Sequence, residues 1–279
     1  MNDTVRLDIY VNDNTPNITR SMATKIVKMG LVEVNNEVVI KPSFKISEKD
    51  SVKINYKEED FLPKKELEIP IIYKDDNVIV IDKPEGVLTH SKGNFNPEET
   101  VETWLEPYLI DLEGPRAGIV HRLDRGTSGV MILARTQKAY KKLTKQFADR
   151  KVKKTYIAIV DGHLKENEAL IDLPIERNPK QPNSFKIGIN GKTSQTNYKV
   201  ISSNEKYSLV ELKPLTGRTH QLRVHLNYLK HPIAGDFIYG GSKQPRMYLH
   251  AKSLEITIPE SERRIFECKI PEDFVKLIK

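Results

Sequence analysis

The feature that most constrains this chain is a polar loop, bounded by glycine, between two apolar runs. Residues 121–129 read HRLDRGTSG, and the apolar runs cover residues 118–120 and 130–134. Apolar runs of this length that meet a Gly-rich polar turn are typical of buried strands joined by a loop. We therefore expect the loop to leave one buried strand and enter another, which would hold its single carboxylate, Asp124, on a rigid rim.

Asp124 stands between two arginines, Arg122 and Arg125. Two nearby guanidinium groups favour an ionised carboxylate at neutral pH, which suits a nucleophile or a base better than a general acid. Taken alone, however, the same nonapeptide also fits an ordinary salt bridge inside a loop. Other parts of the chain must decide between the two interpretations.

Composition narrows the class of protein. The chain has 279 residues, 38% hydrophobic and 30% charged, which is enough for one large domain and a small one. The formal net charge of +7 favours a polyanionic partner, although basic proteins that never bind nucleic acid also exist. Cys268 is the only cysteine, so an intramolecular disulfide and a thiolate zinc site are excluded and a reducing, cytoplasmic setting is expected.

The first residues carry no cationic stretch leading into an apolar run. No window approaches the roughly 20 apolar residues that a membrane span requires. We therefore expect neither a secretory signal nor a membrane anchor.

Residues 1–58 predict a small αβ domain. A helix should begin at a Thr19 or Ser21 cap and end at Gly30, after which valines alternate around a hairpin turn at Asn35 and Asn36. A closing strand follows at residues 50–54. Residues 59–68 are charged, polar and interrupted by proline, which is typical of a linker.

Residues 69–279 predict a larger, strand-rich domain. Helices are expected at about 100–105, 136–150 and 219–228 and after Pro271, from their caps and apolar spacing. The strands are expected in a hairpin over 69–81, at 152–160 with both faces covered, in an antiparallel run over 167–215, and at 248–258 and 264–270.

Four motifs, in order, resemble one enzyme family. HRLDRGTSG at 121–129 is similar to the signature of the RluA/RluD-type pseudouridine synthases. IDKPEG at 81–86, KTYIAIV at 154–160 and TGRTHQLRVH at 216–225 match the lysine-proline, tyrosine and arginine motifs of that family. The resemblance runs from about residue 70 onward. It implies an enzyme that isomerises uridine in RNA to pseudouridine without a cofactor or a metal.

The resemblance also implies catalytic roles for three residues. Asp124 would attack the target uridine, at the base or at the ribose, and Tyr156 would act on a proton during the rearrangement. Arg223 would bind Asp124 bidentately and hold it in attacking geometry. By position alone, Tyr156 fits a residue of the core better than a catalytic one, and Arg223 fits an arginine at the surface beside an apolar stripe.

RNA contacts are expected in both domains. A uridine stacked in RNA must be flipped out to react, and Arg122 is the candidate to fill the vacated place. By resemblance, residues 1–58 are similar to the RNA-binding domain first described in ribosomal small-subunit protein four; a charged solvated face on a structural appendage is the alternative. The remaining expected RNA contacts are Lys83, Arg125 and His220 in the large domain and Arg20, Lys25 and Lys28 in the small one.

The fold class implied is α+β, with a mixed, mainly antiparallel sheet, flanking helices and the small αβ domain. The expected partner is ribosomal large-subunit RNA, with transfer RNA as the alternative, and the protein is expected to be monomeric. A different function would be that of a ribosome-assembly factor that binds RNA without catalysis. A metal-dependent nuclease is disfavoured because the sequence shows no convincing cluster of carboxylates and histidines.

Overall fold

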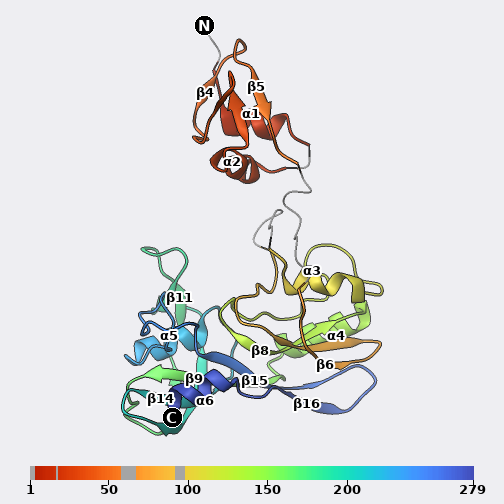
Figure 1. Cartoon of the computed structure of the whole chain (residues 1–279). Coiled ribbons are helices and arrows are strands. Elements are labelled where there is room, and N and C mark those ends of the chain that lie inside the picture. The colour runs from red at the N-terminus through yellow and green to blue at the C-terminus, as the bar shows by residue number, and fades with distance from the viewer. Residues whose placement is uncertain (1–3, 17, 58–66, 92–97) are drawn as a thin grey trace. The chain divides into compact units, whose positions relative to one another are not determined.

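The computed structural model describes residues 4–16, 18–57, 67–91 and 98–279 (Figure 1). Contacts divide the chain into two compact units, one comprising Met1–Glu66 with Ser91–Glu99 and the other Leu67–His90 with Thr100–Lys279. Most of the expected linker, residues 59–66, lies outside the described residues. Within the described part of the chain, no helix is long and apolar enough to cross a membrane.

The small unit packs two helices against short strands. Its helices are α1 (Leu7–Asp13) and α2 (Arg20–Lys28), and α2 begins as predicted, with the Thr19 side chain accepting a hydrogen bond from the backbone N–H of Met22. The predicted hairpin turn is confirmed, since Asn35 and Asn36 both have positive φ. Helix α1 was not predicted. The strands are β1 (Val5–Arg6), β2 (Val32–Val34), β3 (Glu37–Val38), β4 (Lys45–Ile46) and β5 (Val52–Ile54).

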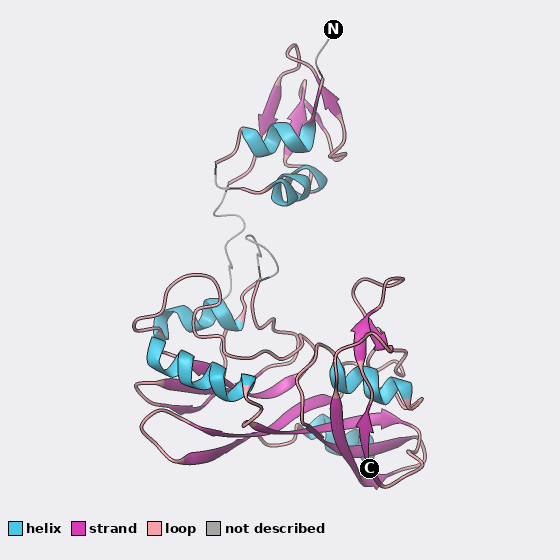
Figure 2. Cartoon of the chain, turned by 180° about the vertical axis from the view of Figure 1, so that it is seen from behind, coloured by secondary structure: helices cyan, strands magenta, loops and turns pink. Residues whose placement is uncertain are grey.

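The large unit is built on a nine-stranded sheet, seen from behind in Figure 2. Its strand order is β10-β13-β14-β9-β15-β8-β7-β6, with β16 also paired to β15, and every pairing is antiparallel except that of β15 with β8. The predicted α+β class with a mainly antiparallel sheet is confirmed. The strands are β6 (Ile71–Lys74), β7 (Val78–Lys83), β8 (Ser128–Ala134), β9 (Lys153–Asp161), β10 (Glu168–Asp172), β13 (Gln195–Ser203), β14 (Tyr207–Pro214), β15 (Leu249–Thr257) and β16 (Arg263–Glu267).

Helices cover both faces of β7 and β8. The α3 helix (Val101–Leu105), continued by the 3₁₀ turn η2 (Glu106–Tyr108), packs on one face, and α4 (Gln137–Ala148) packs on the other. Side chains alternate between these faces along each strand, so that both faces need apolar residues. Ile79, Ile81, Met131 and Leu133 pack with α3, whereas Val78, Val80, Val130 and Ile132 pack with α4.

The other half of the sheet packs against α5 (Gln221–Tyr228) and α6 (Glu272–Ile278). Residues 157–160 of β9 are all buried, as expected for a strand covered on both faces. The antiparallel run expected over 167–215 is only partly in the sheet: β11 (Ile175–Arg177) and β12 (Phe185–Ile187) pair with each other in a separate hairpin.

Residues 118–120 do not form the strand that was expected before the loop of residues 121–129. Gly118 has φ +76° in a turn, and its carbonyl accepts a hydrogen bond from the N–H of Ala134. Two residues earlier on β8, the N–H of Ile132 donates to the Nε2 atom of His121 at 3.1 Å. A side chain thus provides a hydrogen bond that a neighbouring strand would otherwise make, so the loop enters a strand without leaving one.

Gly129 allows β8 and β15 to meet directly after the loop. Their parallel pairing is limited to Ser128 with His250 and Gly129 with Ala251. Gly129 has φ +112°, and a Cβ atom there would lie 2.2 Å from the carbonyl oxygen of Ala251. Since any side chain would clash with the backbone, the second glycine of HRLDRGTSG is required by this close approach.

Candidate active site

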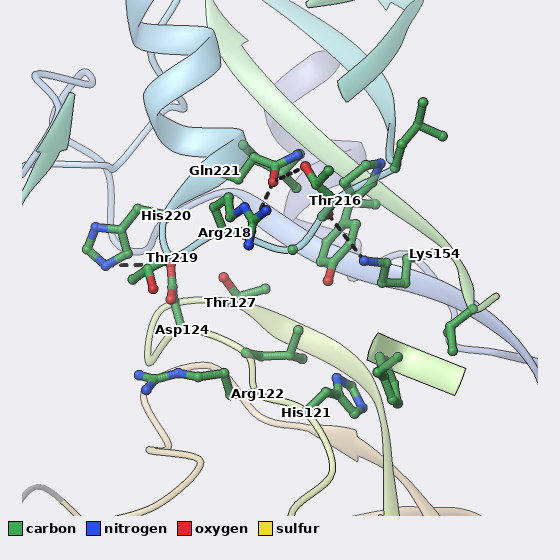
Figure 3. A pocket seen from close by; sticks show the side chains of 18 of the residues that line it. His121, Arg122, Asp124, Thr127, Lys154, Thr216, Arg218, Thr219, His220 and Gln221 are labelled. Carbon is green, nitrogen blue, oxygen red and sulfur yellow. Dashed lines mark hydrogen bonds and ion pairs between the residues drawn. The ribbon is translucent and has the colours of Figure 1, made fainter. Parts of the chain in front are cut away.

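A cleft of about 460 Å³ opens where the loop before β8, the end of α4, the start of β9 and the segment before α5 come together (Figure 3). Its wall includes residues from three of the four sequence motifs, those at 121–129, 154–160 and 216–225. Asp124 and His220 lie at one side of the view in Figure 3, and Lys154 and His121 lie at the other. The two ends of the cleft have different chemistry.

Asp124 is held by an arginine from a distant part of the chain. The Nη1 atom of Arg223 donates to Asp124 Oδ2 at 3.1 Å, and the two residues are 99 positions apart. Within the described residues, the ion pairs of Asp124 are with Arg223 and, at 3.8 Å, with His220 Nε2. The sequence correctly predicted a guanidinium beside Asp124, but the one that pairs with it belongs to Arg223 and not to the arginines that flank it in the loop.

The prediction that Arg223 binds Asp124 bidentately is wrong. The fork of Arg223 instead binds Asp236, with Nε to Oδ2 at 2.7 Å and Nη2 to Oδ1 at 2.8 Å. The reason is burial: Asp236 is only 1% exposed, and a buried carboxylate needs a partner that saturates both oxygens. Asp124, with 21% of its side chain exposed, receives a single hydrogen bond from Nη1 and keeps an oxygen available to the cleft.

This arrangement keeps Arg223 charged. Burial works against its charge, but the hydrogen bonds and charges of Asp236 and Asp124 outweigh burial and raise the pKa of Arg223. Its guanidinium also lies 5.0 Å from the centre of the Tyr239 ring, a favourable position for a cation. Arg223 is therefore a fixed cation between two carboxylates, and its expected alternative, a surface arginine, does not apply because it is 6% exposed.

His220 connects Asp124 to Tyr239. The residue precedes α5 with φ +55°, its Nδ1 atom lies 2.9 Å from the hydroxyl of Tyr239, and that hydroxyl accepts the backbone N–H of Phe185 at 2.9 Å. Burial lowers the pKa of His220, which favours the neutral imidazole, and burial raises the pKa of Tyr239 to about 12. We assign the phenol as the donor to Nδ1, which leaves the Nε2 proton facing Asp124.

Tyr156 lies on β9 and lines the same cleft. Burial, and then the charge of Asp124, raise the pKa of its phenol well above the usual value, so it is protonated at neutral pH. A carboxylate, a fixed arginine and a protonated phenol in one cleft can support nucleophilic attack and proton transfer.

The expectation that Lys83 contacts RNA is wrong. Its side chain is completely buried, and its ammonium donates to the carbonyls of Pro84 and Val87 at 2.7 Å and of Arg125 at 3.4 Å. Burial lowers the pKa of Lys83 to about 8. Lys83 thus ties the loop of residues 84–87 to the loop that carries Asp124, which is a structural role.

The other expected RNA contacts are at or near the surface. Arg122 lines the cleft and is exposed, with Nη1 3.4 Å from His90 Nε2; Arg125 is also exposed but does not line the cleft. In the small unit, Arg20 lies 3.6 Å from Asp8 while remaining 58% exposed. Lys25 and Lys28 are exposed in the last turn of α2, and not at its N-terminus.

Sequence analysis missed three polar residues at the site: Asp236, Tyr239 and Lys154. Asp236 had a detectable signal, because it is the only charged residue in the apolar stretch 232–241. Lys154 stood in the KTYIAIV motif, but only the tyrosine of that motif was interpreted. In the described part of the chain, no three His, Cys, Asp or Glu side chains are grouped so that they could hold a metal ion.

Comparison with known proteins agrees with this geometry. Residues 77–228, more than half of the chain, match the family model described as RNA pseudouridylate synthase. The chain belongs to this family. Residues 5–52 match the S4 domain model, which is an RNA-binding module. The predicted enzyme class, an RNA pseudouridine synthase, and RNA binding are thereby confirmed.

Relatives match over nearly the whole chain. It is 37% identical to ribosomal large subunit pseudouridine synthase D of Borreliella burgdorferi, over 97% of this chain and 88% of the relative. It is 32% identical to the protein of the same name from Escherichia coli, over 98% and 90%. Among solved structures, human RNA pseudouridylate synthase domain containing 1 superposes with a TM-score of 0.62 at 29% identity, covering 76% of this chain and 86% of that one.

Proposed function

We propose that this protein converts specific uridines of ribosomal large-subunit RNA to pseudouridine, with the target base flipped into the cleft and Asp124 as the nucleophile. The observation that carries the proposal is the Asp124 carboxylate, held in the cleft by an arginine whose other side is locked by buried Asp236. The names of the relatives from Borreliella and Escherichia support the large-subunit RNA as the substrate.

The isomerisation breaks the bond between ribose carbon 1′ and base nitrogen 1 and forms one between carbon 1′ and carbon 5. Carbon 5 loses its proton and nitrogen 1 gains one. Asp124 forms the covalent bond to the nucleoside, and Arg223 orients its carboxylate. Tyr156 enters the reaction as a neutral phenol and acts on a proton while the base is rearranged. No step of this scheme uses a metal or a cofactor.

Access to the uridine requires that it leaves the RNA stack. Arg122 is exposed on the cleft wall, two residues before Asp124 in the chain, and it would occupy the place that the base vacates. Arg125 and His220 would hold the strand near the flipped nucleotide. His220 offers a neutral donor, and Arg125 offers a charge for a phosphate.

We further propose that residues 1–58 form a separate RNA-binding domain, joined by residues 59–68 to a catalytic domain of residues 69–279, in a monomeric cytoplasmic protein. Arg20, Lys25 and Lys28 would contact phosphates remote from the cleft. To test this, a protein starting near Leu67 is compared with the full chain on a minimal stem-loop and on a long structured RNA. Rates should match on the stem-loop and fall on the long RNA. Equal rates on both RNAs would make residues 1–58 a structural appendage.

The alternative is an RNA-binding assembly factor without catalysis, and the paired Asp124 and Arg223 argue against it because binding alone needs no oriented carboxylate. Mapping pseudouridines by carbodiimide chemistry in cells with and without the gene separates the two. The proposal expects specific large-subunit positions to lose the modification without the gene. A loss of pseudouridine confined to transfer RNA would mean that the substrate is transfer RNA. An unchanged pseudouridine map together with no activity in vitro would favour the assembly factor.

A further inference from the structure

A largely buried lysine lies in the cleft away from Asp124. Lys154 stands near the start of β9, and its ammonium lies 3.4 Å from the carbonyl oxygen of Thr216, the contact drawn as a dashed line in Figure 3. The next residue, Gly217, leaves the space beside the ammonium open, since a Cβ atom there would stand 3.7 Å from Nζ. The ammonium is thus at the cleft wall, where a bound molecule can reach it.

The charge of Lys154 is not compensated by the protein. Among the described residues, no carboxylate lies within ion-pair distance of its ammonium, and the Thr216 carbonyl is the hydrogen-bond acceptor found. Burial lowers the pKa of Lys154 to about 8. An ammonium that is desolvated without a carboxylate destabilises the free protein, so a structural role alone does not account for it.

His121, at the same end of the cleft as Lys154, does not provide a negative charge either. His121 stacks on Phe147 with ring centres 4.6 Å apart, and its Nε2 atom accepts the backbone N–H of Ile132. Burial, and then the charge of Lys154, lower the pKa of His121 to about 3, so the ring is neutral. This end of the cleft therefore carries a cation and neutral groups.

Two further positively charged side chains line the cleft together with Lys154. Arg150, exposed after the end of α4, and Arg218, whose Nε donates to the Thr193 carbonyl, line the cleft with Lys154. Among the described residues that line the cleft, Asp124 is the one that carries a carboxylate. Asp124 is already paired with Arg223, so the remaining cations are left for an anionic ligand.

We propose that Lys154 forms a subsite for a backbone phosphate of the RNA strand bound in the cleft, with Arg150 and Arg218 extending the subsite at its mouth. The phosphate subsite rests on the proposed function, the action on RNA, and specifies which part of the RNA strand the cleft recognises. A phosphate is favoured over a uracil carbonyl because an uncompensated cation gains most from a full negative charge, and phosphates are the anions of RNA. Lys154 is in this sense a binding residue and does not act on the base.

The test measures how RNA affinity depends on salt in four full-length proteins: wild type, Lys154→Met, Lys154→Arg and Lys199→Met. Lys199 is the matched control, an exposed lysine on β13 that does not line the cleft. The probe is a fluorescein-labelled oligouridylate of about twelve nucleotides, long enough to cover a typical single-strand site. Fluorescence anisotropy gives the Kd at several KCl concentrations, and no turnover is needed.

Loss of one phosphate contact should lower the slope of log affinity against log salt by about 0.7 in Lys154→Met. Affinity at low salt should fall about tenfold, as expected for one charge-assisted hydrogen bond. Lys154→Arg should retain most of the slope, and Lys199→Met should match wild type. The Tm of Lys154→Met should rise by about 2–4 °C, since a desolvated charge is removed.

Equal slopes in wild type and Lys154→Met would overturn the phosphate subsite, and so would a fall in affinity with an unchanged slope, which would indicate a neutral ligand group. A lower slope of the same size in Lys199→Met would overturn it too. If Lys154→Met does not fold, Lys154→Gln replaces it, with the same expected loss of slope. Because the assay measures binding, wild-type protein without isomerase activity would refute the proposed function separately.

Discussion

Among the described residues, charged side chains are paired with each other at one end of the cleft and are without an opposite charge at the other. At one end, Asp124, Arg223 and Asp236 form a chain in which each charge has a partner, and the buried carboxylate takes two hydrogen bonds from the arginine. At the other end, the ammonium of Lys154 lies near one carbonyl oxygen, and no carboxylate of the described chain pairs with it.

This contrast distinguishes the charges that must be in place before substrate binds from those that the substrate itself compensates. A nucleophile has to be ionised and aimed in the free enzyme, so its partners are built into the protein and are fixed by packing. A charge that recognises a ligand gains its stabilisation only when the ligand binds. The predictions below test this comparison at each end of the cleft.

The largest effect is expected for Asp124→Asn. Removing the nucleophile from an otherwise assembled site should lower the isomerisation rate by about 10⁴-fold or more. RNA affinity should stay within a few-fold of wild type, because Arg223 keeps Asp236. The measurement is tritium release from RNA labelled at carbon 5 of uridine, with Kd from the same RNA. Turnover comparable to wild type would end the mechanism proposed above.

Arg223→Lys should lower the rate by about a hundredfold, since a point charge cannot bind both oxygens of Asp236 and still orient Asp124. The matched control is Arg263→Lys, an arginine of β16 that does not line the cleft and whose Nε donates to one oxygen of Glu255. Circular dichroism establishes that the variant is folded before kcat is compared. Near-normal kcat in Arg223→Lys would show that the bidentate fork is not needed for catalysis.

Tyr239→Phe should lower kcat by about tenfold with little change in KM, because one hydrogen bond that positions His220 is lost. The hydroxyl that is removed joins His220 Nδ1 to the Phe185 N–H, both at 2.9 Å, whereas the ring under Arg223 stays. Tyr140→Phe on α4 is the control. An equal rise in KM without a fall in kcat would place Tyr239 in RNA binding instead of positioning.

The smallest effect concerns the pH dependence of stability at the Lys154 end. The pKa of His121 is about 3 in the folded protein, against roughly 6.5 unfolded, so the unfolded chain takes up the proton first as pH falls. Its contribution to stability is full above pH 6.5 and is lost as pH falls towards about 3. The free energy of unfolding should therefore fall between pH 7 and pH 5, by about 1–2 kcal/mol from this residue.

Urea unfolding of wild type and His121→Gln at both pH values provides the measurement. Glutamine can still accept the Ile132 N–H but does not titrate, so the variant should lose less stability between pH 7 and pH 5 than wild type does. The same pH dependence in both proteins would show that folding does not lower the pKa of His121, so that two cations share this end of the cleft at pH 5.

Much of the fold could be predicted from local patterns. Apolar runs predicted β9, with both faces covered, and the β6–β7 hairpin, and the caps at Thr19 and Thr136 predicted where α2 and α4 begin. These predictions hold because an element's own residues decide its hydrogen bonds and its buried face. Residues 118–120 had the composition of a strand, but a histidine side chain made the hydrogen bond that would have defined one.

Four motifs in the family's order were enough to predict the family and the α+β class, and they singled out Asp124, Tyr156 and Arg223 as the proposed catalytic residues. Which charges meet could be read only from the folded chain. Arg223 donates two hydrogen bonds to Asp236 and a single one to Asp124. The ammonium of Lys83 is buried and donates to backbone carbonyls, so it does not lie at the surface. The physical reason is that a buried charge takes whatever partner the folded chain brings within about 3 Å, and that distance is set by packing between segments far apart in sequence.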